Sequence, residues 1–221
     1  MLKFILCLCL FSYSNIVFSQ SIELRNAFIT TSKFWSQKKY EKSLFFNEKA
    51  IQLSLIEFGP KHISTATLLE NKGRLLIKLK KFKEAQLEFE KVLKIRENQK
   101  KINDLEIADT LNYLSISLRM QKKFKKALQK HDKVLNIMSK IMATNPRKIS
   151  DLSRRSAIYR ASALHTKGDF YRKEGLNSDA EGNYIVASRI YTTTLGQNSD
   201  ELKEVLSILN IIRNEKSNYQ F

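Results

Sequence analysis

A short pattern that returns at regular intervals constrains this chain more than any other feature of its sequence. Each copy places a small residue four positions after its start, and the first three copies begin with a lysine and an aromatic residue at Lys39, Lys81 and Lys123, 42 residues apart. A fourth, weaker copy begins at Leu176 after a longer step of 53 residues. Self-similarity at such a period indicates repeated supersecondary units, none of which can bury its apolar face alone.

Each copy lies where two amphipathic segments meet. Apolar residues recur at three- and four-residue steps from Ala66 to Lys80 and again from Phe82 to Leu93, which is the periodicity of α-helices with one buried face. We therefore predict four antiparallel helix pairs and no β-sheet, with Gly73 lying against Ala85. Small or β-branched residues occupy the columns where paired helices would touch: Thr31, Gly73, Ser115 and Gly168, facing Ser43, Ala85, Ala127 and Ala180.

At these residues the chain resembles the tetratricopeptide repeat family, whose unit is a helix–turn–helix of 34 residues. The 42-residue period is similar to that of the kinesin-light-chain type. The resemblance implies an all-α, right-handed α-solenoid with repeats over about 24–57, 66–99, 108–141 and 161–194. The fourth copy matches the family pattern at the most positions: Leu164, Gly168, Tyr171, Ala180, Tyr184 and Ala187.

Two segments depart from the regular period. The spacer over 142–160 is long enough to extend the following helix by about three turns of 3.6 residues, which would keep its buried face in register. We predict a break at Asn145-Pro146, an N-cap at Ser150 and one long helix from Asp151 to about Lys173. A closing helix over 200–214 and a frayed tail over 215–221 are expected after the last repeat.

The N-terminal segment has a different composition from the repeats. Lys3 precedes an apolar run from Phe4 to Phe11, and Ser19 is a small residue where a signal peptidase could cut. This pattern is typical of a secretory signal peptide over residues 1–20, and the run is well short of the ~20 apolar residues of a spanning helix. An uncleaved anchor and a lipoprotein are the alternatives. We expect an exported protein of the periplasm or extracellular space, with no stable membrane span after cleavage.

The chain is strongly basic, with a formal net charge of +17. This charge allows two interpretations: attraction to an anionic partner, or solvated helix surfaces rich in lysine. Nucleic acid is not expected as a partner, because an exported protein rarely meets it and the sequence has no aromatic-basic platform of the kind that binds single strands.

The sequence carries no pattern of an enzyme. The chain has three histidines, His62, His131 and His165, and none has a nucleophile or a paired carboxylate readable beside it. Metal-ligand spacings and a glycine-rich phosphate loop are also missing. We therefore expect no catalysis, no cofactor and no metal.

The resemblance implies that the inner faces of the first helix of each repeat line a concave groove that holds a protein or peptide segment. In the first copy these positions are Arg25, Phe28, Ser32 and Trp35. Basic residues exceed acidic ones, so we expect an extended partner that is acidic or neutral, and we expect Arg119 and Arg172 to lie on a solvated surface. The candidate groove residues in the other copies are Glu70, Asn71, Arg74, Lys78, Asn112, Tyr113, Arg119, His165, Asp169 and Arg172.

Two functions fit these observations. The first is a non-catalytic interaction scaffold outside the cytoplasm. The second is a sensor or docking region that works with a separate signalling or peptidase domain, as similar repeat arrays do. We expect the first, because the sequence shows neither such a domain nor a second apolar span.

Overall fold

The structure is a computed structural model that describes residues 22–101, 103–144 and 149–218. Every regular element in these ranges is a helix, which confirms the predicted all-α fold class. The chain divides into two compact units, unit 1 up to Lys100 and unit 2 from Lys101. No helix in the described ranges combines the length and the hydropathy needed to cross a membrane. The predicted signal peptide and the predicted break at Asn145-Pro146 lie outside the described residues.

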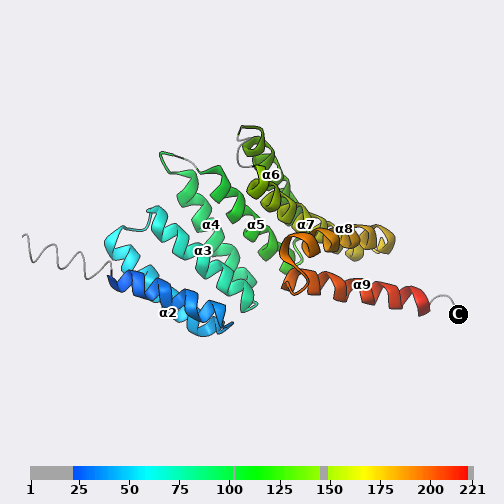
Figure 1. Cartoon of the computed structure of the whole chain (residues 1–221), viewed down its shortest axis with the longest axis horizontal. Coiled ribbons are helices and arrows are strands. Elements are labelled where there is room, and N and C mark those ends of the chain that lie inside the picture. The colour runs from blue at the N-terminus through cyan, green and yellow to red at the C-terminus, as the bar shows by residue number, and fades with distance from the viewer. Residues whose placement is uncertain (1–21, 102, 145–148, 219–221) are drawn as a thin grey trace, which may run out of the picture. The chain divides into compact units, whose positions relative to one another are not determined.

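Unit 1 is built from helix pairs that can be followed in Figure 1. Residues 22–36 form its first helix, followed by α2 (Tyr40–Glu57), α3 (Ile63–Lys78) and α4 (Phe82–Glu97). The first pair is joined by stacking of Phe34 on Phe46, with ring centroids 5.4 Å apart, and by the Ser43 hydroxyl, which donates to the Thr31 carbonyl at 2.8 Å. The small residue predicted at position 43 is therefore a direct contact between the two helices.

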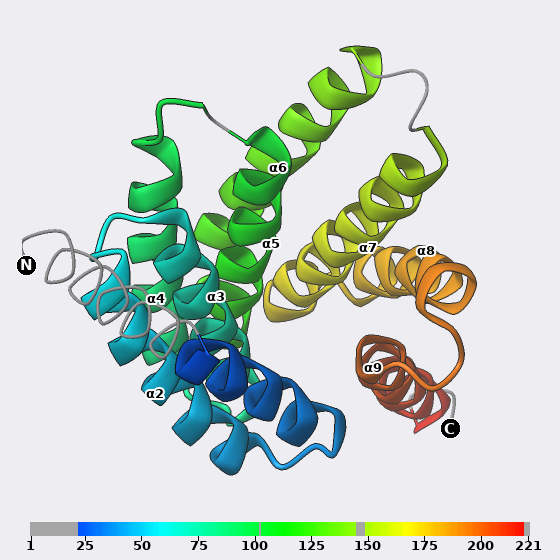
Figure 2. The ribbon, with the colours of Figure 1, turned by 60° about the vertical axis from the view of Figure 1, so that its left-hand side comes forward.

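Unit 2 contains α5 (Asp104–Met120), α6 (Phe124–Thr144), α7 (Ile149–Lys173), α8 (Asn177–Leu195) and α9 (Asp200–Asn218). Each of these helices packs on the next, and α5 also contacts α7. Figure 2 shows α8 and α9 as the last two helices of this unit. Buried residues of α8 and α9 share one hydrophobic cluster with Ala161 of α7, so the closing helix covers an apolar face that would otherwise be exposed.

Two predicted boundaries of unit 2 are wrong. Ser150 lies inside α7 rather than at its N-cap, because the helix already includes Ile149 and has Asp151 in its first turn, where a carboxylate favours the positive helix end. The closing helix does not end at residue 214 as predicted, since α9 continues to Asn218. Salt bridges hold this last turn: Lys216 pairs with Glu181 of α8, and Glu215 accepts from Arg172 of α7 at 3.5 Å.

The turns inside the repeats share one backbone conformation. Lys38, Lys80 and Lys122 have positive φ angles of 57°, 60° and 59°, and Gly175 has the same role in the fourth repeat with φ 80°. The left-handed region costs a residue with a Cβ atom about 1–2 kcal/mol, and glycine avoids that cost. Lysine at this position therefore makes three of the four turns less stable than glycine would.

The column of small residues faces large rings. A Cβ atom added to Gly73 would lie 2.7 Å from the ring of Phe89, and one added to Gly168 would lie 2.6 Å from the ring of Tyr184. The closest contact of Gly73 is thus Phe89, one turn beyond the predicted Ala85. In the third repeat the same pair of positions is polar, with the Ser115 hydroxyl 3.1 Å from Nδ1 of His131.

Candidate functional site

The predicted inner positions of unit 1 form an accessible surface of aromatic and polar side chains. We call it the unit 1 face and define it by Phe28, Ser32 and Trp35 of the helix over 22–36 and by Asn71, Arg74 and Lys78 of α3. The Arg74 guanidinium lies over the Trp35 ring, 5.2 Å from its centroid, and joins the two helices. Phe28 is 42% exposed, and Trp35, Asn71, Arg74 and Lys78 are all partly exposed.

Glu70, the predicted acidic residue next to this surface, is already paired. It forms a salt bridge with Arg96 of α4, and both side chains are nearly buried, with exposures of 12% and 6%. A buried ion pair of this kind holds its partners in fixed positions, because either charge left alone would be costly. The negative charge of Glu70 is therefore directed to α4 and is neutralised there.

The predicted inner positions of unit 2 include residues of a closed ionic network. Nη1 of Arg119 donates to Oδ2 of Asp169 at 2.9 Å and to Oε1 of Glu204 at 3.0 Å, and Nη2 donates to Oε2 of Glu204 at 3.1 Å. Nη1 also lies 3.0 Å from Nε2 of His165, which must accept because a guanidinium can only donate. The Tyr184 hydroxyl completes the network by donating to Oδ1 of Asp169 at 2.6 Å. One side chain of α5 thus connects α7 and α9.

Burial decides the charges in this network. Arg119 is only 7% exposed; burial acts to lower its pKa, but Glu204 and Asp169 outweigh burial, so the pKa is raised above its ordinary value. His165 is 2% exposed, and burial followed by the positive charge of Arg119 lowers its pKa well below the ordinary value. The network therefore contains a neutral histidine, one arginine and two carboxylates.

The prediction that Arg119 lies on a solvated surface is wrong. Asn112 and His165 are also buried, whereas Tyr113, Asp169 and Arg172 are partly exposed. The helix spacing predicts these residues on the inner side of α5 and α7, and the direct contact between α5 and α7 contributes to the burial of that side. Asp109, near the start of α5, contributes to it by accepting from Arg155 at 2.8 Å and from the Tyr159 hydroxyl.

A second buried polar chain lies beside the network. His131 of α6 connects Ser115 of α5 with Thr166 of α7, whose hydroxyl is 3.0 Å from its Nε2 atom. Burial, and then the charge of Arg119, lower the pKa of His131 to about 3. Each histidine ring nitrogen has a partner within the protein, so this chain stabilises the packing of three helices. Among the described residues, no group of three or more histidine, cysteine or acidic side chains could hold a metal ion.

Sequence reasoning did not identify Glu204 and Tyr184 as partners of the predicted groove residues. One signal was present: Arg119 occupies the repeat position that Ile77 has 42 residues earlier. A charged residue at a position that is apolar in the neighbouring repeat indicates a buried ion pair, since an isolated buried charge is not tolerated. The identity of the acidic partner depends on α9, which does not belong to the repeat pattern.

Comparisons with known proteins agree with the repeat pattern. Residues 34–98 match the family model described as "Tetratricopeptide repeat". No curated protein matches the chain. Among solved structures, a Podosopora anserina kinesin light chain with nearly identical TPR-like repeats is similar, with a TM-score of 0.55, 15% identity, and coverage of 88% of this chain and 96% of that chain. The predicted α-solenoid fold is thereby confirmed.

BtubC (BKLC) from P. vanneervenii is a second similar structure. Its TM-score is 0.45 at 13% identity, over 89% of this chain. This chain covers 66% of BtubC, slightly less than two thirds of its length.

Proposed function

We propose that this chain is a non-catalytic tetratricopeptide repeat scaffold that binds an extended protein or peptide segment on the unit 1 face. The family match over residues 34–98 and the similar fold of the kinesin light chain repeats support this proposal. Repeats of this family generally mediate protein–protein interaction, and the family is typically non-catalytic. The observation that carries the proposal is the Arg74–Trp35 pair, which is partly exposed and lies on the same helix face as the exposed ring of Phe28.

The chemistry of the unit 1 face suits a peptide. Tryptophan and arginine are the residues most enriched among the side chains that dominate binding energies. Asn71 adds a carboxamide that can donate to and accept from the backbone of an extended segment. Trp35 and Phe28 present rigid apolar area, and Arg74 presents charge at the same place.

The charges of this face favour an acidic or neutral partner. Arg74 and Lys78 of the face are basic, as is Arg25 on the helix over 22–36, and the nearby carboxylate of Glu70 is neutralised by Arg96. Attraction of an acidic segment would act mainly on the association rate. Salt would screen it over about 10 Å at 0.1 M ionic strength.

The place where this binding occurs is part of the proposal. The residues of 1–20 support export to the periplasm or the extracellular space. N-terminal sequencing of the protein from its native host is expected to begin at Gln20 or Ser21. A soluble cytoplasmic protein that begins at Met1 would refute export while leaving the binding proposal intact.

The single tryptophan of the chain allows a direct test. Peptides selected on the immobilised mature chain would be titrated against it while the fluorescence of Trp35 is recorded. We expect a saturable change in fluorescence, and a dissociation constant at least about tenfold weaker in Phe28→Ser or Arg74→Ala.

The matched controls are Phe45→Ser on α2, where the ring is 65% exposed, and Lys94→Ala on α4, an exposed cation. Neither residue belongs to the unit 1 face, so both variants should bind like the parent chain. Equal losses in the face variants and the controls would refute the proposed site.

A further inference from the structure

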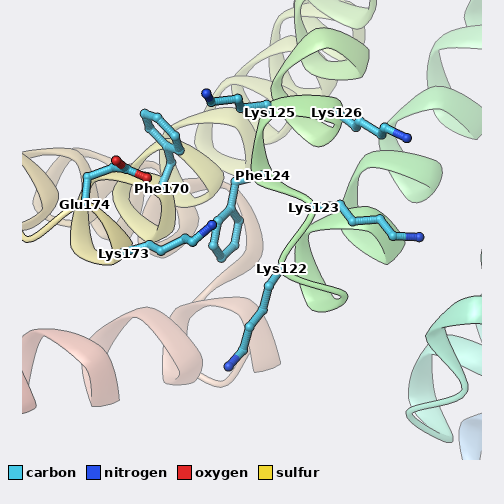
Figure 3. Close-up of a pocket in the computed structure, with 8 residues that line it drawn as sticks. All are labelled: Lys122, Lys123, Phe124, Lys125, Lys126, Phe170, Lys173 and Glu174. Atoms are coloured by element: carbon cyan, nitrogen blue, oxygen red, sulfur yellow. The ribbon is translucent and has the colours of Figure 1, made fainter.

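A cleft in unit 2 lies at the edge where the repeats turn, and none of the residues of the ionic network lines it. Its volume is about 330 Å³, and it is lined by the turn between α5 and α6, the first turn of α6 and the last turn of α7. Phe124 and Phe170 form its apolar part, while Lys125 and Lys173 extend along the two rings (Figure 3). Lys122, Lys123 and Lys126 surround it, and Glu174 is the one acidic residue in the lining.

The charge of this cleft is not explained by the stability of the fold. The first turns of α2, α4 and α8 each contain one acidic residue, Glu41, Glu84 and Asp179, whereas the first turn of α6 contains none. Lysines occupy it instead, at positions 125 and 126. Cations near a helix N-terminus oppose the helix dipole. This arrangement is unfavourable by itself and becomes favourable when an anionic group lies beside it.

The apolar part of the cleft restricts the kind of anion. A small inorganic anion would gain nothing from Phe124 and Phe170. A nucleic acid or lipid surface would contact mainly Lys122, Lys123 and Lys126, because phosphate contacts with lysine and arginine supply most of the non-specific affinity. Two rings between Lys125 and Lys173 instead match a segment in which an apolar side chain has acidic neighbours.

We propose that this cleft is a second docking site that binds an acidic peptide segment of a partner protein, with one apolar side chain inserted between Phe124 and Phe170. The flanking carboxylates of the segment pair with Lys125 and Lys173. Lys122, Lys123 and Lys126 increase the attraction at longer range. This site shares no residue with the unit 1 face, so it binds a second segment of the same partner or a different protein.

The test uses the mature chain and a fluorescein-labelled pentapeptide that has one phenylalanine between two pairs of glutamates. Binding would be measured by fluorescence anisotropy at 0.1 M salt. We expect the double variant Lys125→Glu, Lys173→Glu to bind about tenfold more weakly or worse, because two attractions become repulsions. The matched control reverses Lys133 and Lys140, which are exposed on α6 and do not line the cleft, and should change the affinity by less than about twofold.

Further measurements test the apolar contact and distinguish a peptide ligand from other anionic ligands. Replacing the phenylalanine of the peptide by alanine should weaken binding by about fivefold to tenfold if the two rings hold it. Circular dichroism would check that each variant remains helical, and Phe28→Ser should leave this binding unchanged, which distinguishes the cleft from the unit 1 face. Equal losses in both double variants would overturn the proposal. So would stronger competition by a single-stranded oligonucleotide or by phosphatidylglycerol vesicles than by unlabelled peptide.

Discussion

The inner helix faces of the two units use arginine side chains in opposite ways. In unit 1, Arg74 lies over Trp35 and both side chains remain partly exposed. In unit 2, Arg119 is buried between Asp169 and Glu204 and connects three helices. A repeat period determines toward which neighbour a side chain points. The partners available there decide whether that side chain is accessible or is part of the core.

The closing helix accounts for much of this difference. Glu204, on α9, supplies two of the oxygen contacts of Arg119 and lies outside the repeat pattern. The column that pairs Gly73 with Phe89 in the second repeat is polar in the third repeat, at Ser115 and His131. Unit 1 therefore has an accessible inner face, whereas the inner side of unit 2 carries buried polar networks.

The largest effect is expected from removing the buried arginine. Arg119→Leu would leave Asp169 and Glu204 without their cation, and the loss in free energy of unfolding should be about 3–5 kcal/mol. Arg74→Leu in unit 1 should cost less than about 1 kcal/mol, because its partner ring is partly exposed. Urea unfolding followed by circular dichroism compares the two. Similar losses in both variants would contradict the contrast between the units.

A smaller loss in free energy of unfolding is expected at acid pH, and it should come from residues of unit 2. The folded pKa of His131 is about 3, below the value of about 6.5 in an unfolded chain. As the pH falls below 6.5, the unfolded state binds a proton that the folded state does not. Stability should therefore fall by about 1.4 kcal/mol per pH unit, or about 2–3 kcal/mol between pH 6.5 and 4.5.

Replacing the polar pair of the third repeat by the apolar pair of the second isolates this acid effect. The double variant Ser115→Gly, His131→Phe copies Gly73 and Phe89, and it should lose the part of the pH dependence that His131 supplies. His165 would still contribute, because its pKa is also depressed. Urea unfolding at pH 6.5 and 4.5 checks this, and an unchanged pH dependence would show that His131 has no part in it.

The smallest effect concerns the glycine column. A Cβ atom at Gly73 would come within 2.7 Å of the Phe89 ring, so Gly73→Ala should cost about 1–3 kcal/mol and Gly73→Leu at least as much. Gly182, inside α8, has nothing within 4 Å of an added Cβ atom. Gly182→Ala should therefore stabilise the protein by about 0.5–1 kcal/mol. Thermal unfolding would measure both, and a Gly73→Ala variant that melts at or above the parent temperature would contradict this packing.

Periodicity and turn chemistry were sufficient to predict the helix pairs. The steps of 42 and 53 residues located the turns at Lys38, Lys80, Lys122 and Gly175, which all have positive φ. Helix ends were less accurate, because α9 is prolonged by ion pairs to other helices that no local pattern contains. The docking surfaces and the export signal stay predictions.

The sequence by itself determined the all-α fold, the repeat register and the columns through which paired helices touch, because these depend on the spacing of apolar and small residues along one helix. Only the tertiary structure decided which polar positions became surface and which became core. Arg119 and Arg74 are both arginines on inner helix faces, yet one meets two carboxylates and the other meets an indole ring. The free energy of a charged group depends on its burial and on the charges within a few ångströms, and distant parts of the chain supply both.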